Sequence, residues 1–159
     1  MAREIVLDTE TTGFEPSQGH RLVEIGCIEL INHLPTGRIF HTYINPERDV
    51  PEEAYNVHGL SYDFLKAHPL FRDVGSLFLD FIEDSPLVIH NAKFDIGMLE
   101  KENLFVPTHI DTLRVARALD TKNSIPRYNL QYLRYYLEID IEATAHDAMG
   151  DVLVPKELF

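Results

Sequence analysis

Apolar positions in the first third of the chain fall into three segments with the pattern of strands. Residues 3–8, 21–30 and 37–44 either alternate apolar with polar residues or run together as Val, Ile and Leu. The segments between them are short and carry residues typical of turns, namely Gly13, Pro16, Gly19, Asn32, Pro35 and Gly37. Because parallel strands need long crossover connections, this spacing predicts an antiparallel meander of three strands.

The apolar spacing becomes helical after residue 50, with one exception. Residues 86–91 contain a short apolar run and predict a buried strand. Asp111 and Asn129 are residue types that favour helix N-caps. Helices are expected over residues 50–65 (as short turns), 71–83, 94–103, 111–118, 129–137 and 148–154. This order predicts an α/β fold in one domain, residues 1–159, with a mixed central sheet flanked by helices.

Composition narrows the class of protein. The chain has 159 residues, of which 45% are hydrophobic, so it can bury a substantial core and is not a disordered segment. Its apolar runs are too short to span a bilayer, and its N-terminus lacks the pattern of a secretory signal. Cys27 is the only cysteine, which excludes an intrachain disulfide and a cysteine zinc site. These features fit a protein of the reducing cytoplasm.

The charge distribution is uneven. The formal net charge is -12, which argues against broad non-specific binding to nucleic acid but not against an enzyme whose bound cations reverse the local field. Five of the 14 basic residues lie in one stretch, residues 114–134. This stretch is either a solvated helix face or a rim that meets phosphates, and composition alone does not decide between the two.

Two carboxylates follow the first apolar strand. In "IVLDTETTGF", Asp8 and Glu10 are two residues apart, so on a strand their side chains point to the same face, about 7 Å apart at ~3.3 Å per residue. At that spacing they repel each other unless a cation binds between them or one is protonated. The alternative is a strand end that emerges into solvent, where acidic residues cost little.

Two later segments also place acidic residues at the ends of apolar elements. Asp95 follows the strand "PLVIHN" at the start of a helix, where an acid is also favourable to the helix dipole. His146 and Asp151 are five residues apart, roughly 140° off a common helix face at 100° per residue. They converge only if His146 precedes the helix or lies in its first turn. Otherwise both are ordinary exposed residues.

Taken together, the segments favour a metal-dependent phosphoryl hydrolase. Four carboxylates without a sulfur or histidine cluster suit Mg²⁺ or Mn²⁺ better than zinc. Two such cations can activate a water and stabilise the charge that develops during phosphodiester hydrolysis. A neutral histidine can accept the proton of the water near pH 7. The candidate residues are Asp8, Glu10, Asp95, His146 and Asp151.

With these residues in view, the chain resembles the DEDD superfamily of 3'-5' exonucleases, in the subgroup with a histidine in its third motif. Within it, the chain is most similar to the proofreading ε subunits of bacterial DNA polymerase III. The resemblance rests on "IVLDTETTGF", "VHGL", "HNAKFDIGML" and "HDAMGD", which together span Ile5 to Asp151. It implies a ribonuclease H-like fold, two divalent cations (Mg²⁺ or Mn²⁺), and removal of nucleoside 5'-monophosphates from single-stranded or frayed DNA.

The resemblance also implies roles for individual residues. Asp8, Glu10, Asp95 and Asp151 would be the metal ligands, and His146 the general base. Residues that match the substrate-binding positions of the family are Thr11, Glu53, Val57, His58, Asn91 and Phe94. Several of these, Val57 and Phe94 among them, could equally be core residues.

Three questions stay open at this level. The chain ends eight residues after Asp151, so a segment that binds a polymerase is not apparent, and a free-standing exonuclease or a domain of a longer protein is expected. A polymerase partner is nevertheless implied by the resemblance. The alternatives for function are a 3'-5' exoribonuclease that trims RNA, and a non-catalytic module that binds nucleic acid or a polymerase.

Overall fold

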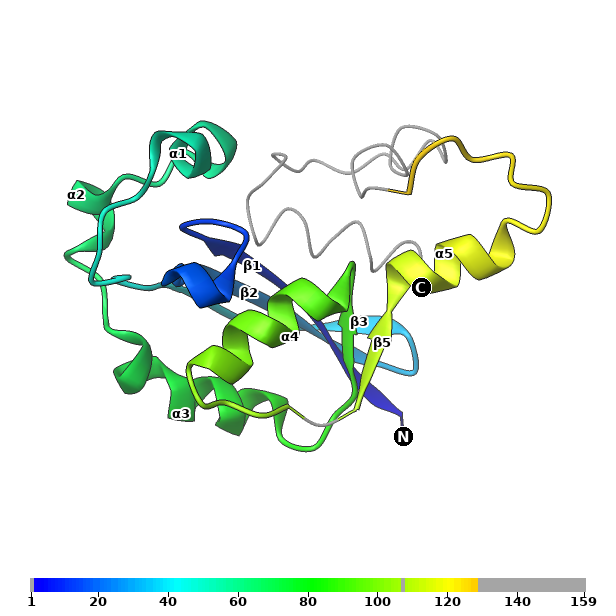
Figure 1. The fold of residues 1–159 in the computed structure, drawn as a ribbon. Coiled ribbons are helices and arrows are strands. Elements are labelled where there is room, and N and C mark those ends of the chain that lie inside the picture. The colour runs from blue at the N-terminus through cyan, green and yellow to red at the C-terminus, as the bar shows by residue number, and fades with distance from the viewer. Residues whose placement is uncertain (1, 107, 129–159) are drawn as a thin grey trace.

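The computed structural model describes residues 2–106 and 108–128, which contain a mixed sheet flanked by helices (Figure 1). Its strands lie in the order β3-β2-β1-β4-β5. The strands are β1 (Arg3–Thr11), β2 (Leu22–Ile31), β3 (Leu34–Tyr43), β4 (Leu87–Ile89) and β5 (His109–Asp111). The helices are the 3₁₀ turn η1 (Pro16–Gln18), α1 (Glu52–His58), α2 (Tyr62–Leu65), α3 (Phe71–Ile82), α4 (Ala92–Lys101) and α5 (Thr112–Leu119).

The pairing of the strands brings three strand ends to one edge of the sheet. β1, β2 and β3 pair antiparallel, which confirms the predicted meander. β1 pairs parallel with β4, and β4 parallel with β5. The carboxyl ends of β1, β4 and β5 therefore meet at one edge, the position where α/β sheets commonly bind ligands.

Four details of the predicted elements need correction. β3 begins at Leu34, three residues before the predicted start, so the expected turn residues Pro35 and Gly37 lie within the strand. β1 continues to Thr11 instead of ending at Asp8, because its pairing with β2 extends through Leu22. α4 begins two residues before the predicted start, at Ala92. β5 was not predicted. It contains only three residues, of which the first, His109, is exposed, and such a short segment has no recognisable strand pattern. The predicted helices 129–137 and 148–154 lie outside the described residues.

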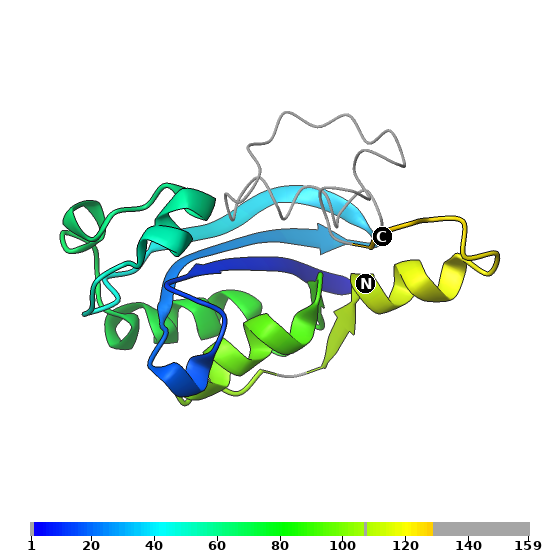
Figure 2. The ribbon, with the colours of Figure 1, turned by 45° about the horizontal axis from the view of Figure 1, so that its top comes forward.

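The main core lies between one face of the sheet and helices α3 and α4, as Figure 2 shows. Helix α3 contributes Val74, Phe78 and Ile82, which recur every four residues and form one apolar stripe. The strands contribute Ile5 and Leu7 from β1, with Ile25, Cys27, Leu87 and Ile89. The other face carries a smaller buried cluster, Val6, Ile28, Leu30 and Val88. The odd-numbered residues of β1 thus face α3 and α4, and the even-numbered residues face the other way.

A buried polar cluster joins the meander to α3. Glu29 is 4% exposed and accepts hydrogen bonds from Arg3 Nε (2.6 Å), Thr36 Oγ1 (2.7 Å) and Arg38 (2.8 Å). Arg3 also donates to the carbonyls of Phe81 and Ile82 at the end of α3. The Arg3 guanidinium is the main reason that the pKa of Glu29 lies below its usual value. One carboxylate therefore connects β1, β2, β3 and, through Arg3, α3.

We expect Glu29→Gln to lower the free energy of unfolding by about 1–2 kcal/mol at pH 7, because an amide weakens the charge-assisted bonds from Arg3 and Arg38. A carboxyl whose pKa is lowered by folding stabilises the protein above its unfolded pKa and loses that effect as the pH falls through its folded pKa. The difference between wild type and variant, measured by urea denaturation, should therefore begin to shrink below the ordinary pKa of glutamate, about 4.3, and vanish once the pH lies below the lowered pKa of the folded state. A difference that is independent of pH would contradict this assignment.

No helix in the described part of the chain is long and apolar enough to cross a membrane.

Candidate active site

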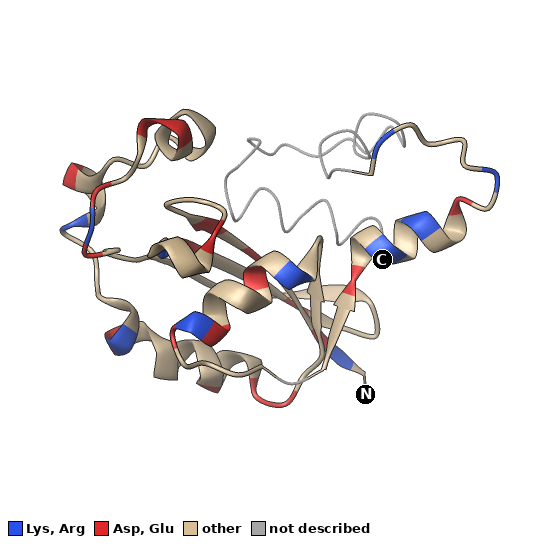
Figure 3. Cartoon of the chain, viewed as in Figure 1, with Lys and Arg blue, Asp and Glu red and all other residues tan. Residues whose placement is uncertain are grey.

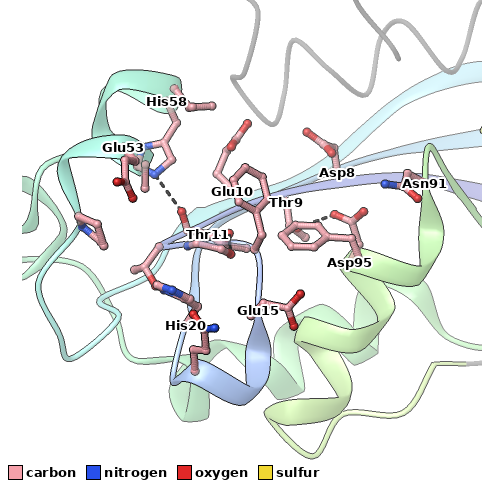
Figure 4. A pocket seen from close by; sticks show the side chains of 18 of the residues that line it. Asp8, Thr9, Glu10, Thr11, Glu15, His20, Glu53, His58, Asn91 and Asp95 are labelled. Carbon is pink, nitrogen blue, oxygen red and sulfur yellow. Dashed lines mark hydrogen bonds between the residues drawn. The ribbon is translucent and has the colours of Figure 1, made fainter. Parts of the chain in front are cut away.

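A cavity of about 700 Å³ opens at the carboxyl ends of β1 and β4. Its walls come from the end of β1, the turn that contains η1, helix α1, and the segment that joins β4 to α4. Figure 4 shows how the side chains of these four segments surround it. All three predicted carboxylates of the described chain, Asp8, Glu10 and Asp95, line this cavity.

Asp8 and Glu10 reach the cavity from the same face of β1, as the strand alternation predicts. They share that face with Val6, on the side of the sheet away from α3 and α4. Glu10 is 9% exposed, and the Oδ2 atom of Asp8 is buried. The pair is thus not a solvated strand end, which was the alternative interpretation of the sequence.

Asp95 comes from the first turn of α4, on the other side of β1. It is 2% exposed and accepts a 2.5 Å hydrogen bond from Thr9 Oγ1, whose side chain lies on the opposite face of the strand from Asp8 and Glu10. Burial raises the pKa of Asp95 to about 7, and the hydrogen bond from Thr9 counteracts part of that rise. A single strand therefore supplies two carboxylates and holds the third in place.

Asp111 fixes the start of the helix that carries Asp95. Its Oδ1 accepts from the backbone N–H of Asn91 (2.9 Å) and its Oδ2 from that of Ala92 (3.2 Å). Oδ1 also accepts from Leu113 N (2.9 Å), which confirms the predicted N-cap of α5. Asn91 itself adopts a left-handed backbone with φ of 60°. The carboxylate at the end of β5 thus positions the first turns of two helices.

The donor set suits a hard divalent cation. Asp8, Glu10 and Asp95 offer only oxygen, and no lysine or arginine among the described residues lines the cavity. The described lining of the cavity has no basic side chain to balance the negative charge of these three carboxylates, so a bound cation would offset that charge. Within residues 2–106 and 108–128, however, no group of three or more His, Cys, Asp or Glu side chains is arranged so that it could hold a metal ion. The remaining predicted ligand, Asp151, and the predicted base, His146, lie outside the described residues.

Thr11 and His58 connect the end of β1 to helix α1. The pairing of β1 with β2 shifts between Glu10 and Thr11, an irregularity that redirects the backbone at this point. His58 Nε2 lies 3.0 Å from the carbonyl oxygen of Thr11, and His58 Nδ1 accepts from Leu60 N (3.0 Å). Since a carbonyl only accepts, the proton of the neutral ring is on Nε2. His58 therefore holds α1 against the strand end.

The other predicted substrate-binding residues line the same cavity. Glu53 and Val57 face it from α1, and Asn91 and Phe94 from the start of α4. The ring of Phe94 lies 6.2 Å from that of Phe14, which is 78% exposed. The structure therefore brings Thr11, Glu53, Val57, His58, Asn91 and Phe94 together, and their roles toward a substrate stay predictions.

His20 supports the turn that follows β1. Its Nδ1 lies within hydrogen-bonding distance, 3.0 Å, of Thr12 Oγ1, which also accepts from Arg21 N (3.0 Å). Gly13 packs against the ring so closely that a Cβ at residue 13 would lie 2.4 Å from His20 Cε1. Burial, followed by the charges of Arg48 and Lys101, lowers the pKa of His20, which favours the neutral ring.

His90 is a further lining residue, placed directly after β4. Its Nε2 lies 2.8 Å from the carbonyl oxygen of Tyr128 and its Nδ1 2.9 Å from Thr112 Oγ1. Burial lowers the pKa of this histidine. His90 thereby joins the cavity wall to the chain beyond α5.

The roles of four of these residues were not predicted from the sequence, for different reasons. Thr9 and His90 carried a usable signal, since one lies between two predicted ligands and the other ends a strand. His20 and Gly13 carried none, because their contact depends on how the turn folds back.

Comparisons with known proteins identify relatives of this chain. A profile of the exonuclease family (RNase_T) matches residues 5–159. The DNA polymerase III subunit epsilon of Rickettsia conorii is 48% identical over 165 residues, covering 99% of this chain and 72% of that protein. Exonuclease X in complex with 5' overhanging duplex DNA superposes with a TM-score of 0.77 at 23% identity, over 98% of this chain and 89% of that one. E. coli exonuclease I in complex with a dA16 oligonucleotide superposes with a TM-score of 0.83 at 17% identity, over 99% and 40%.

At these identities the two superposed structures establish the ribonuclease H-like fold, whereas the profile and the epsilon subunit establish the family. The chain belongs to the RNase_T family of exonucleases.

Proposed function

We propose that this chain is a divalent-metal-dependent 3'-5' exonuclease that removes nucleoside 5'-monophosphates from single-stranded or frayed DNA, and that residues 1–159 form one exonuclease domain. The observation that carries the proposal is the meeting of Asp8, Glu10 and Asp95 at one cavity whose described lining has no lysine or arginine. Such a site repels a phosphodiester until cations bind, and attracts it afterwards.

The proposed ligands of two cations, Mg²⁺ or Mn²⁺, are Asp8, Glu10, Asp95 and Asp151. Bound there, the cations would polarise the scissile phosphate and offset the charge that develops on its oxygens. His146 is the proposed general base that takes the proton from the attacking water. Thr9 and Asp111 keep Asp95 oriented through the hydrogen bonds described above.

The proposed substrate contacts avoid the base edges. The aromatic rings of Phe14 and Phe94 can stack on bases, which is tolerant of sequence. Glu53 and the backbone of Thr11 are the proposed contacts to the terminal nucleotide, with Val57, His58 and Asn91 completing its pocket. A nuclease that removes any nucleotide benefits from this choice, because only base-edge contacts carry sequence information.

A role in proofreading is supported by the relative in Rickettsia, which is named as a subunit of DNA polymerase III. We propose accordingly that DNA is the substrate and a DNA polymerase the protein partner. The dA16 oligonucleotide bound to exonuclease I supports a single-stranded substrate for this fold.

The proposal is tested with one oligonucleotide carrying a label at either the 3' or the 5' end, incubated with Mg²⁺ or Mn²⁺. We expect the 3' label to be released at once as a mononucleotide, and the 5'-labelled strand to shorten in single steps. EDTA should stop both. Release of only the 5' label, or activity that EDTA leaves unchanged, would overturn the proposal.

A matched RNA strand tests the second candidate, a 3'-5' exoribonuclease. That candidate is favoured if cleavage requires the 2'-hydroxyl, the group that distinguishes RNA from DNA. The third candidate, a non-catalytic module, would bind no cations in a calorimetric titration.

A further inference from the structure

Most lysine and arginine side chains in the N-terminal part of the chain form hydrogen bonds or ion pairs that hold the fold. Arg3 and Arg38 bind Glu29, Arg21 binds Glu102, and Lys66 binds Asp63. Arg48 and Lys101 donate to backbone carbonyls of the turn before β2. These side chains are therefore committed to holding the fold.

The basic side chains after β5 differ, because most of them have no such structural contact. Arg114, Lys122 and Arg127 are exposed and form no hydrogen bond or ion pair with another described residue. Residues 112–128 contain four basic residues and one acidic residue, although the whole chain has 26 acidic and 14 basic residues. We call Arg114, Arg117, Lys122 and Arg127 the cationic row. Figure 3 shows it on α5 and the segment that follows, within an otherwise largely acidic molecule.

A network around Asp120 holds this segment in a defined conformation. Asp120 is 8% exposed and accepts from the backbone N–H groups of Ser124 and Ile125 and from the hydroxyls of Ser124 and Tyr128, at 2.8–2.9 Å. These bonds, that of Ile125 N first among them, lower the pKa of Asp120 to about 2. The only acid of the segment is thus used internally, and it fixes the turn that carries Lys122 and Arg127.

Tyr128 then joins the cationic row to the catalytic cavity. Its carbonyl oxygen accepts from Nε2 of His90, which lines the cavity. Its ring lies 5.4 Å from the Arg117 guanidinium carbon. Arg127 is the adjacent residue along the chain. The row therefore ends beside the cavity wall and is held there by the same histidine.

We propose that the cationic row binds the phosphodiester backbone of the single strand upstream of the nucleotide in the cavity. This inference rests on the proposed exonuclease function and adds a second, electrostatic site to it. The cavity itself has no described basic lining residue, so attraction for the rest of the strand must come from outside it. Preorganised cations next to the cavity provide this attraction without reading sequence.

The test measures equilibrium binding of a fluorescent 16-nucleotide oligothymidylate by anisotropy in EDTA, so that binding is observed whether or not the protein cleaves DNA. The variant is Arg114→Gln/Lys122→Gln/Arg127→Gln, which leaves Arg117 on Tyr128. A plot of the logarithm of the binding constant against the logarithm of the salt concentration has a negative slope. Each lost phosphate contact should make this slope shallower by about 0.7, and the loss of all three by about 2. At about 0.15 M salt this corresponds to roughly 10- to 50-fold weaker binding.

Arg72→Gln is the control for removal of a basic side chain away from the cationic row. Arg72 is exposed on α3, also has no ion pair with a described residue, and lies away from the cavity, so its loss should leave the salt slope unchanged. A triple variant that binds the oligonucleotide with the wild-type Kd and slope would overturn the inference. Failure of the labelled-strand cleavage test would instead overturn the proposed exonuclease function.

A second variant tests whether the ordered conformation of the turn matters for binding while all four basic residues of the row are kept. Asp120→Ala keeps every cation of the row but removes the network that orders the turn. We expect weaker binding to the oligonucleotide with a salt slope closer to that of wild type than to that of the triple variant. Binding unchanged in Asp120→Ala would mean that preorganisation of the row plays no part.

Discussion

Asp8→Ala is expected to abolish cleavage, with a loss of at least roughly 10³-fold in kcat/KM on a single-stranded oligonucleotide. The physical reason is that Asp8 is one of the proposed cation ligands, and the charge stabilisation supplied by the cations is worth several kcal/mol in the transition state. Steady-state kinetics with Mg²⁺ and with Mn²⁺ provide the measurement. A calorimetric titration with Mn²⁺ should show weakened or lost cation binding.

Two further variants make this result specific. Asp8→Asn keeps the size of the side chain and should be as inactive as Asp8→Ala, which excludes a packing defect. Asp80→Ala removes an exposed aspartate of α3 and should leave activity unchanged. Activity of Asp8→Asn above a tenth of wild type would contradict the assignment of Asp8 as a cation ligand.

Gly13→Ala is expected to destabilise the protein by about 2–4 kcal/mol and to impair cleavage. The new Cβ would lie 2.4 Å from the His20 ring, so the ring must move and its hydrogen bond with Thr12 is lost. Displacement of Thr12 would shift the end of β1, which carries Glu10 and Thr11. Chemical denaturation and single-turnover cleavage measure the two effects.

A double-mutant cycle isolates the contact. Gly13 does not have a positive φ, so alanine is acceptable to the backbone, and the three atoms nearest to a new Cβ all belong to the His20 ring. His20→Ala removes the ring, and the double variant should be about as stable as His20→Ala alone, so that the coupling energy equals the whole effect of Gly13→Ala, about 2–4 kcal/mol. Additive effects would show that the clash is not the cause. Gly97→Ala on α4, where a Cβ meets only Pro16 at 3.9 Å, is the control and should be neutral or stabilising by up to about 1 kcal/mol.

The part of the fold that sequence predicted well is the part specified locally. Residues 21–30 and 37–44 alternate and are joined by short turns, so the meander follows from chain geometry alone. Helix α3 was predicted to within one residue because its apolar stripe is regular. β5 was missed because it is a strand only by virtue of pairing with β4, Leu87 opposite His109.

The same distinction applies to the site. Asp8 and Glu10 could be assigned to one strand face because side chains alternate with a period of two. That Asp95 would reach the same cavity could be expected from its place after a strand, but its bond to Thr9 could not. Asp111 was predicted as the cap of one helix, whereas the structure shows it at the start of two. The second role needs β4 and β5 to lie side by side.

The amino-acid sequence by itself determined the chemistry of this protein. It specified carboxylates at the ends of apolar elements, a fold class, and the segments that match an exonuclease family. Only the tertiary structure decided which of these side chains line the same cavity and which neighbouring residues hold them in position. His58 against Thr11, His20 against Gly13, and Tyr128 against His90 each join residues between 7 and 47 positions apart along the chain. Periodicity is a local property, whereas such contacts exist only once the sheet and its turns have formed.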